Sequence, residues 1–440
     1  MFSDAPAFLV YRFHRGAPVY IVFYMKTLPF GLGIAAVASI LCVVGCGKRI
    51  NSIGDDHFDR DGYCLDSLQE TFLAVPPTKI DFYVESSGSM NGFFRRNQPT
   101  DFKKDVWSIV SNFGNPGVAV LSNDGTHVTN YSGYQFQTNM NTGSFVSNAS
   151  TKVPEMLKTI LNTTDFEHGA VAVLISDMKY SPVGARAVNA LTAQYKTDIR
   201  NVVGQHKGLA YSVICAYSNY LAANGSVAYD KSPYYYVVIG IDQCVAYVRN
   251  AIITLIDDNG RYLEDFEMGF DYKAPAYVFG QVENAIQLDD EPTFYAFNPS
   301  VSDTCSFTLG IDLSGYLWKL ADEDVLRQLL KVNAVYGSTV ELGKMKITVD
   351  NHYNKELLRT AMAAVRVKVT DMLMDNEVIE WSLDHPEYMC SQTFETIMNC
   401  PDENDLSGSF SMNQFIEGVF AANQNHWTKE PRRILISKNQ

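Results

Sequence analysis

Three oxygen-bearing side chains, Glu85, Ser87 and Ser89, follow directly on an apolar run and are spaced two residues apart. The run, Ile80 to Val84, is rich in β-branched and aromatic residues and predicts a buried strand. The segment after it has turn chemistry, since serines bond locally and Gly88 permits backbone conformations that other residues resist. At the carboxyl end of a parallel strand, such a loop opens into the crevice where α/β proteins bind ligands. The three side chains would then present oxygens to one point, and hard cations such as Mg²⁺ take oxygen ligands.

A second apolar run also ends in a carboxylate. Residues 170–175 are continuously apolar, as expected for a strand that is covered on both faces, and Asp177 follows them after one serine. We predict that Asp177 lies across the crevice from Glu85 and completes a site for a divalent cation. The alternative is that Asp177 caps a helix or a turn.

These segments together resemble a known family. Residues 85–90, Glu-Ser-Ser-Gly-Ser-Met, resemble the Asp-x-Ser-x-Ser metal-site motif of von Willebrand factor A domains, and the run ending at Asp177 is similar to the family's fourth strand. The resemblance implies a doubly wound, mostly parallel sheet flanked by helices, with Mg²⁺, or else Mn²⁺ or Ca²⁺, in the crevice. The chain departs from the family at Glu85, where the family has Asp, and at Met178, where it often has Gly.

A threonine at the start of a helix supplies a further metal oxygen in that family. Thr151 is our candidate and Ser150 the second, because both precede Pro154, a residue that suits the first turn of a helix. Either side chain is equally well interpreted as a helix N-cap.

The resemblance implies a non-enzymatic adhesion or assembly module, in which a partner protein's carboxylate completes the coordination of the metal. The departures at Glu85 and Met178 keep a second hypothesis open, a degenerate A domain that has lost its metal and serves as a scaffold. A third hypothesis is a hydrolase with Ser87 or Ser89 as nucleophile. It is disfavoured because the chain has no Gly-x-Ser-x-Gly elbow and no histidine in a recognisable setting.

The predicted α/β domain covers residues 78–258, where strands and amphipathic helices alternate as in βαβ units. Within it, residues 126–131 predict a returning edge strand, and the polar residues 132–148 predict a loop. Residues 259–440 predict a β-rich, sandwich-like domain with inserted helices. Its predicted strands are 276–279, 293–297, 306–313, 346–349, 365–370 and 434–436, and its helices are 322–330 and 412–422.

The N-terminal region has the layout of a secretory signal. A lysine follows Met25, the apolar run Leu28 to Val44 comes next, and Cys46 stands after a small residue, which resembles a bacterial lipobox. We therefore expect an upstream over-extension at 1–24, a signal peptide at 25–45, a lipidated Cys46 and a tether at 46–77. The expected location is the cell envelope, with the outer membrane favoured. A single spanning helix and an uncleaved signal are the alternatives.

Charge and cysteine content narrow the possible partners. The formal net charge of −14, with no stretch rich in Lys or Arg to offset it, argues against a nucleic-acid partner. The cysteines after Cys46 have no zinc-ligand spacing. Cys390 and Cys400 are the pair nearest in sequence if disulfides form, and buried free thiols are an equal interpretation.

Overall fold

The computed structural model divides the chain into two compact units, residues 1–50 and 51–440. It describes residues 58–59, 63–64, 74–145, 151–180, 188–287, 293–296, 304–313, 322–350, 360–384, 390–427 and 431–438, all in the second unit. The predicted signal peptide, Cys46 and Ser150 lie outside the described residues. In the part of the chain that is described, no helix has both the length and the hydropathy needed to cross a membrane.

The α/β half is built on a seven-stranded sheet of order β3-β2-β1-β4-β6-β5-β7. Its strands are β1 (Lys79–Ser86), β2 (Val118–Ser122), β3 (Val128–Tyr131), β4 (Ala170–Ser176), β5 (Ala210–Leu221), β6 (Val227–Gly240) and β7 (Tyr262–Met268). The predicted parallel arrangement is confirmed for the centre, where β1 pairs in parallel with both β2 and β4. The remaining pairs are antiparallel, including the predicted edge strand β3.

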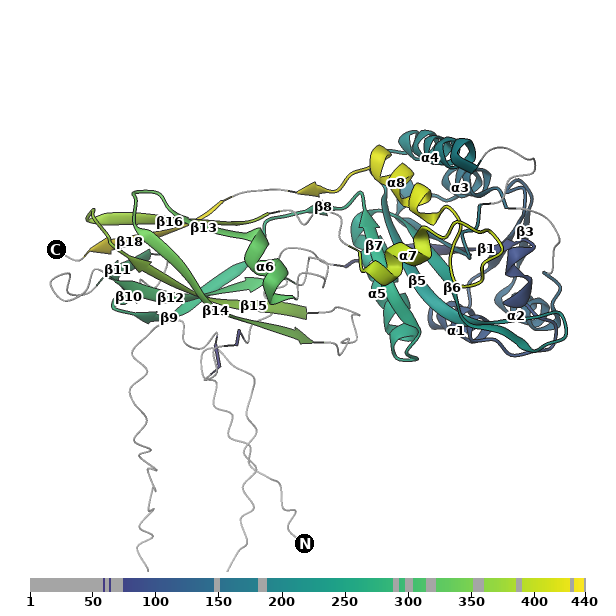
Figure 1. Ribbon diagram of the computed structural model, residues 1–440, viewed down its shortest axis with the longest axis horizontal. Helices are drawn as coiled ribbons and strands as arrows, with labels where there is room; N and C mark the ends of the chain where they lie inside the picture. Colours follow the sequence, from purple (N-terminus) through teal and green to yellow (C-terminus); the bar gives the residue numbers. More distant parts are fainter. Residues whose placement is uncertain are drawn as a thin grey trace, which may run out of the picture. The chain divides into compact units, whose positions relative to one another are not determined.

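Helices cover both faces of this sheet (Figure 1). One face packs against α1 (Asp101–Asn112), α2 (Gly133–Thr142) and α5 (Asp242–Asp257), and the other against α3 (Val153–Thr163) and α4 (Val188–Gly204). Successive side chains of a strand point to opposite faces, so Phe82 and Val84 join the first core whereas Tyr83 joins the second. The fold class, α/β with flanking helices, agrees with the prediction.

The long β5–β6 hairpin separates β5 from β4. The chain leaves β4, crosses through α4 to β5, and then folds back so that β6 lies between them. The turn is closed by hydrogen bonds from the Ala222 amide to the Ser226 carbonyl, 2.8 Å, and from the Gly225 amide to the Ala222 carbonyl, 2.9 Å. Gly225 has φ +83°, a conformation that glycine adopts without strain. An antiparallel pair therefore stands where simple βαβ alternation predicts parallel strands.

The loop prediction for residues 132–148 is wrong in its first part, because α2 forms there. Ser132 and Gln135 make a reciprocal capping box, and Gly143 ends the helix in the left-handed conformation. Phe136 and Met140, four residues apart, are both buried and attach the helix to the core. The capping residues and this single apolar pair are sufficient to form the helix, although most of the segment is polar.

The β-rich half consists of two sheets stacked on each other (Figure 1). One has the order β10-β11-β18-β16-β13 and the other β14-β15-β12-β9. The strands are β9 (Tyr277–Glu283), β10 (Ala285–Gln287), β11 (Thr293–Ala296), β12 (Cys305–Asp312), β13 (Leu330–Ala334), β14 (Thr339–Asp350), β15 (Thr360–Thr370), β16 (Asn376–Leu383) and β18 (Arg432–Lys438). Tyr277 of one sheet meets Trp381 of the other edge to face, with ring centroids 5.2 Å apart. Each predicted strand overlaps an observed one, and the predicted helix 322–330 corresponds to α6 (Glu323–Leu329).

Part of the chain after residue 258 belongs to the α/β half. Strand β7 is the seventh strand of the first sheet, and α7 (Gln392–Met398) and α8 (Met412–Ala422) pack into the same core as α3 and α4. The predicted helix 412–422 is therefore present but lies outside the sandwich. The chain leaves the α/β half through β8 (Asp271–Tyr272), which pairs with β17 (His426–Trp427) on the returning segment.

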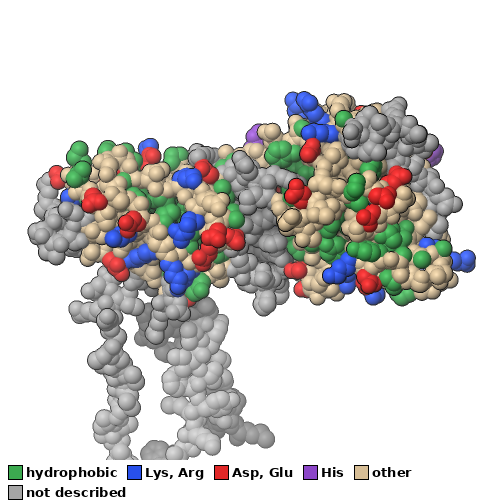
Figure 2. All heavy atoms as spheres, in the orientation of Figure 1, with side chains coloured by type: hydrophobic (Ala, Val, Ile, Leu, Met, Phe, Trp, Pro, Cys, Tyr) green, Lys and Arg blue, Asp and Glu red, His purple; other side chains and the backbone are tan. Residues whose placement is uncertain are grey.

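The described residues show how charge is distributed on one face and the state of the cysteine pair nearest in sequence. On the face seen in Figure 2, acidic and basic side chains are interspersed and do not gather into a basic field. Cys400 is a free thiol whose Sγ donates to the Asp402 carbonyl at 3.4 Å, so the disulfide between Cys390 and Cys400 is not formed.

Candidate metal centre

The register of the central strands places both predicted carboxylates at one edge of the sheet. Strands β1 and β4 run in parallel with Val84 opposite Ile175, so Glu85, the last residue but one of β1, lies level with Ser176, the last residue of β4. Asp177 follows immediately. Glu85 is completely buried and Asp177 is 1% exposed. The two acids thus meet in the crevice at the carboxyl ends of parallel strands, the usual location of ligands in α/β sheets.

Hydroxyl groups surround the Glu85 carboxylate. Thr151 Oγ1 donates to Glu85 Oε1 at 2.7 Å, and Ser176 Oγ donates to Glu85 Oε2. The Ser87 hydroxyl is a third hydrogen-bond partner. Thr151 precedes the N-cap of α3, which is Lys152, so its side chain serves the carboxylate and does not cap the helix.

A chain of hydrogen bonds joins the motif to Asp177. Ser87 Oγ lies 3.0 Å from Ser89 Oγ, and Ser89 Oγ donates to Asp177 Oδ1 at 3.1 Å. The same carboxylate oxygen accepts a bond from the Lys179 amide at 3.3 Å, a local turn contact of the kind expected if Asp177 were a cap. The structure therefore brings together Glu85, Ser87, Ser89, Thr151 and Asp177, the full set proposed from sequence.

Burial disfavours the charged forms of the Glu85 and Asp177 carboxylates. Burial, and then repulsion from Asp177, raises the pKa of Glu85 to about 7, although hydrogen bonds from Ser176, Ser87 and Thr151 oppose the rise. Burial also raises the pKa of Asp177, and the nearby Lys179 ammonium and the Ser89 hydroxyl oppose that rise. Two like charges held out of water favour either a shared proton or a bound cation.

Two backbone positions differ from expectation. Gly88 has φ −64° and ψ −37°, an ordinary right-handed conformation, so the predicted need for glycine freedom there is wrong. Met178 has φ +56°, in the left-handed region where glycine is unstrained. The amide of Met178 donates to Ser176 Oγ at 2.7 Å, which orients that hydroxyl toward Glu85. Met178 thus holds the left-handed conformation without being a glycine, and its side chain is fully buried.

Two other contributors to the site, Ser176 and Lys179, carry no recognisable sequence signal. Ser176 is hidden at the end of an apolar run, and Lys179 has no motif of its own. A distant segment between α7 and α8 also contacts the turn after β4: Ser409 Oγ donates to the Asp177 carbonyl at 3.1 Å, and Lys179 Nζ donates to the Asp405 carbonyl at 2.6 Å. More than 200 residues separate these partners in sequence, and no local pattern predicts their contact.

The donor set suits a small hard cation better than a soft one. It contains two carboxylates and three hydroxyls and no sulfur or nitrogen, which is the chemistry that Mg²⁺, Mn²⁺ and Ca²⁺ prefer. Among the residues that the structure describes, no group of three or more His, Cys, Asp or Glu side chains is placed to hold a metal. A cation here would therefore depend on hydroxyl oxygens in addition to the acid pair.

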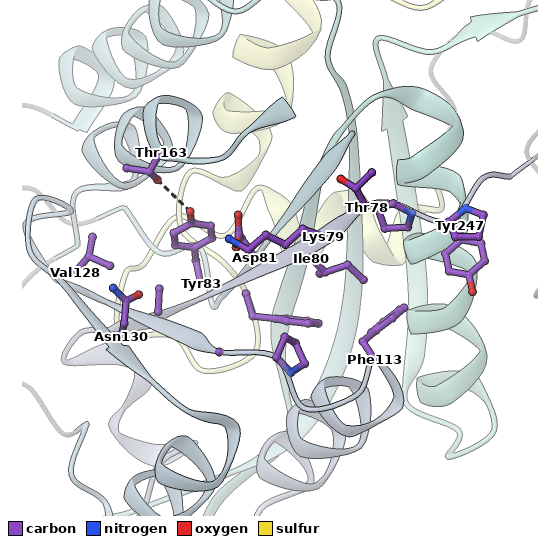
Figure 3. A pocket seen from close by; sticks show the side chains of 16 residues that line it. Thr78, Lys79, Ile80, Asp81, Tyr83, Phe113, Val128, Asn130, Thr163 and Tyr247 are labelled. Carbon is purple, nitrogen blue, oxygen red and sulfur yellow. Dashed lines mark hydrogen bonds and ion pairs between the residues drawn. The ribbon is translucent and has the colours of Figure 1, made fainter. Parts of the chain in front are cut away.

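A separate pocket of about 810 Å³ lies at the amino ends of β1 and β2 (Figure 3). Its lining includes Lys79 and Asp81, which form an ion pair at 2.7 Å, and the half-buried rings of Phe113 and Tyr247. Tyr83, also in the lining, bonds Thr163 Oγ1 at 3.0 Å. No sequence motif indicated this pocket, and its charges are already balanced.

Comparison with known proteins adds no assignment: no family model, no curated protein and no solved structure matches the chain.

Proposed function

We propose that the α/β half is a von Willebrand factor A-like module that binds a divalent cation and, through it, a carboxylate of a partner protein. The observation that carries the proposal is the buried pair Glu85 and Asp177, joined through Ser87 and Ser89 at the carboxyl ends of the parallel strands β1 and β4. The parallel order β2-β1-β4 around the motif supports the likeness. The antiparallel insertion of β6 beside β4 is a departure from simple alternation.

In this proposal each residue has a distinct role. Glu85 and Asp177 attract the cation electrostatically, because its charge would offset the burial that raises both pKa values and the repulsion from Asp177 that adds to the rise for Glu85. Ser87, Ser89 and Thr151 supply neutral oxygens. A site with only two anionic ligands leaves the cation able to accept a further carboxylate, which a partner's Asp or Glu would provide.

The test is calorimetric titration of Mg²⁺, Mn²⁺ and Ca²⁺, each separately, into residues 51–440, the compact unit that contains every described element. We expect binding to at least one cation, its loss in Asp177→Ala, and weakening in Ser87→Ala with the fold retained. Asp81→Ala is the matched control, since this carboxylate lies on the same strand at the pocket end. Absence of binding to all three cations, or equal loss in the control, would overturn the proposal.

One observation favours a metal-free scaffold as the second candidate. Both Glu85 oxygens already accept hydroxyl hydrogen bonds, and a proton held at a pKa of about 7 would neutralise the pair without any cation. In that case neither the wild type nor Ser87→Ala would bind a cation, so the substitution would change nothing in the titration. The same titration therefore separates the two candidates.

We further propose that Cys46 carries a lipid that anchors the chain to the cell envelope, with the outer membrane favoured. The support is the sequence pattern of Lys26, the apolar run and Cys46, all outside the described residues. The full chain expressed in a bacterium should fractionate with membranes, and the mass of its N-terminal peptide should show acylation at Cys46. Unmodified Cys46 in that peptide would refute the anchor. Cys46→Ser should abolish the modification, whereas Cys64→Ser should not.

A further inference from the structure

Two neighbouring turns of the β-rich half expose large apolar side chains. Leu373 is 82% exposed and Met374 is 60% exposed in the connection from β15 to β16, and Val335 and Tyr336 are 47% and 52% exposed in the connection from β13 to β14. Together we call these four side chains the apolar tip. They are a third of the twelve large hydrophobic residues that the described part of the chain exposes, so their occurrence at one place calls for an explanation.

Strand pairing brings the two turns side by side. Both connect one sheet of the sandwich to the other, and they leave from the same end, since Thr339 pairs with Thr370 at the start of β14 and the end of β15. The Val335 amide bonds the Val378 carbonyl at 2.9 Å, which continues the β13–β16 pairing into the turn.

The buried Glu377 carboxylate fixes this geometry. It accepts hydrogen bonds from the Tyr336 amide at 2.7 Å, from the Ser338 amide at 3.0 Å and from the Ser338 hydroxyl at 2.6 Å. Burial acts to raise the pKa of Glu377, but these bonds together outweigh it and lower the pKa, so the carboxylate stays ionised and holds the 335–338 turn against β16.

Several backbone groups of the two turns already have hydrogen-bond partners within the protein. Their amides at 335, 336 and 338 are bonded internally, and the Met372 carbonyl accepts from Lys438 Nζ. Burying the tip therefore removes apolar surface from water without stranding these backbone groups, whose loss of hydration would otherwise be costly. Exposed apolar side chains on turns with these backbone groups already bonded suit insertion between lipid headgroups.

Charge around the tip selects among possible occupants. Asp371 and Asp375 stand on either side of Leu373 and Met374, and Lys438 lies at the base. Two carboxylates oppose an anionic membrane and, across a two-fold axis, oppose a second copy of the same tip. One cation and two anions complement a headgroup that carries both an ammonium and a phosphate.

We propose that the apolar tip inserts into a zwitterionic lipid surface, giving the β-rich half a membrane contact that is independent of the cation site and of Cys46. An apolar contact of this kind would add to the hold of a lipid anchor without depending on it.

The test is co-sedimentation of residues 51–440 with phosphatidylcholine vesicles in the presence of EDTA, which separates it from the cation proposal. We expect the protein to sediment with these vesicles, and the double variant Leu373→Ser with Met374→Ser to bind about tenfold more weakly. The matched control is Val227→Ser with Tyr229→Ser, at the exposed tip of the β5–β6 hairpin, where the side chains are 52% and 39% exposed. The control should bind as the wild type does.

Four outcomes would overturn the proposal: no binding to phosphatidylcholine, equal loss in the control variant, binding only when phosphatidylglycerol is added, or sedimentation-velocity dimers that disappear with the double variant. The last would assign the tip to a second copy of the chain. Because all four substituted side chains are exposed, unfolding temperatures should stay unchanged and loss of binding is not a folding defect.

Discussion

The two ends of strand β1 hold charge in opposite ways. At the amino end, Lys79 and Asp81 form an ion pair at 2.7 Å in an open pocket, where the lysine side chain is 68% exposed. At the carboxyl end, Glu85 meets Asp177, a group of the same sign, and both are buried. The charges that line the pocket balance each other, whereas the buried acid pair keeps raised pKa values despite the Lys179 ammonium and the surrounding hydroxyls. Buried like charge, rather than cavity volume, therefore marks the end of β1 where a cation would gain most.

The largest effect should be a pH-dependent loss of stability in protein stripped of divalent cations. Because the pKa of Glu85 rises from 4.5 to about 7 on folding, the folded state binds the proton more tightly than the unfolded state. Stability is then greatest below pH 4.5 for this group and falls as pH rises through 7, by about 3 kcal/mol in total. Urea unfolding in EDTA between pH 5 and pH 8 measures this slope.

Glu85→Gln should flatten that slope, whereas Asp81→Asn at the pocket end should leave it intact. Adding Mg²⁺ should stabilise the wild type more at pH 8 than at pH 5, because the cation competes with the proton. Identical slopes for wild type and Glu85→Gln would show that the carboxyl end carries no excess charge, and the contrast between the two ends would be lost.

The next largest effect concerns the strained turn beside the crevice. Met178→Gly removes the cost of a left-handed methionine, roughly 1 kcal/mol, but also deletes a fully buried side chain worth more than that. We expect a net loss of about 2 kcal/mol by thermal or urea unfolding. Met178→Leu, which keeps the apolar volume, should cost less. A glycine variant more stable than wild type would mean that backbone strain outweighs packing here.

The site residues at the carboxyl end of β1 were predictable from the sequence, whereas those that line the pocket at its amino end were not. Glu85, Ser87, Ser89 and Asp177 are carried by short patterns at the ends of apolar runs, and parallel register is enough to bring such ends together. Thr151 came only through the family resemblance, and the structure places its hydroxyl on Glu85. That these groups bind a metal stays a prediction.

What the sequence did not reveal depends on distant contacts. The segment that bonds the turn after β4 is inserted between the sandwich strands β16 and β18, and nothing near Asp405 or Ser409 predicts where it packs. The β5–β6 hairpin could have been recognised, because Asn224-Gly225 is a turn signal. The pocket at the amino end has no motif, since it is formed by residues from separate elements whose individual types are ordinary.

At the pocket end, Tyr83→Phe should have a moderate effect. The Tyr83 hydroxyl lies 3.0 Å from both Thr163 Oγ1 and Thr164 Oγ1, and Thr164 is buried. Removing it leaves the Thr164 hydroxyl short of a partner and should cost about 1 kcal/mol in urea unfolding. Thr163 is less affected, because it also donates to the Thr159 carbonyl. Cation affinity should be unchanged, and a change would mean that the two ends of β1 are coupled.

The smallest effect is expected for Lys79→Ala, and it tests the contrast most directly. The ion pair with Asp81 is largely solvated, so it should contribute less than about 0.5 kcal/mol, an amount that high salt would screen further. The hydrogen bond to Asp81 and the charge of that carboxylate raise the pKa of Lys79, but the lysine side chain stays exposed whereas Glu85 is fully buried. Urea unfolding at low and high salt measures the difference. A loss of stability comparable to that from the carboxyl-end variants would show that the ion pair in the pocket contributes as much as the buried acids do. The contrast between the two ends of β1 would then fail, and the pocket would be a second candidate for a charged ligand.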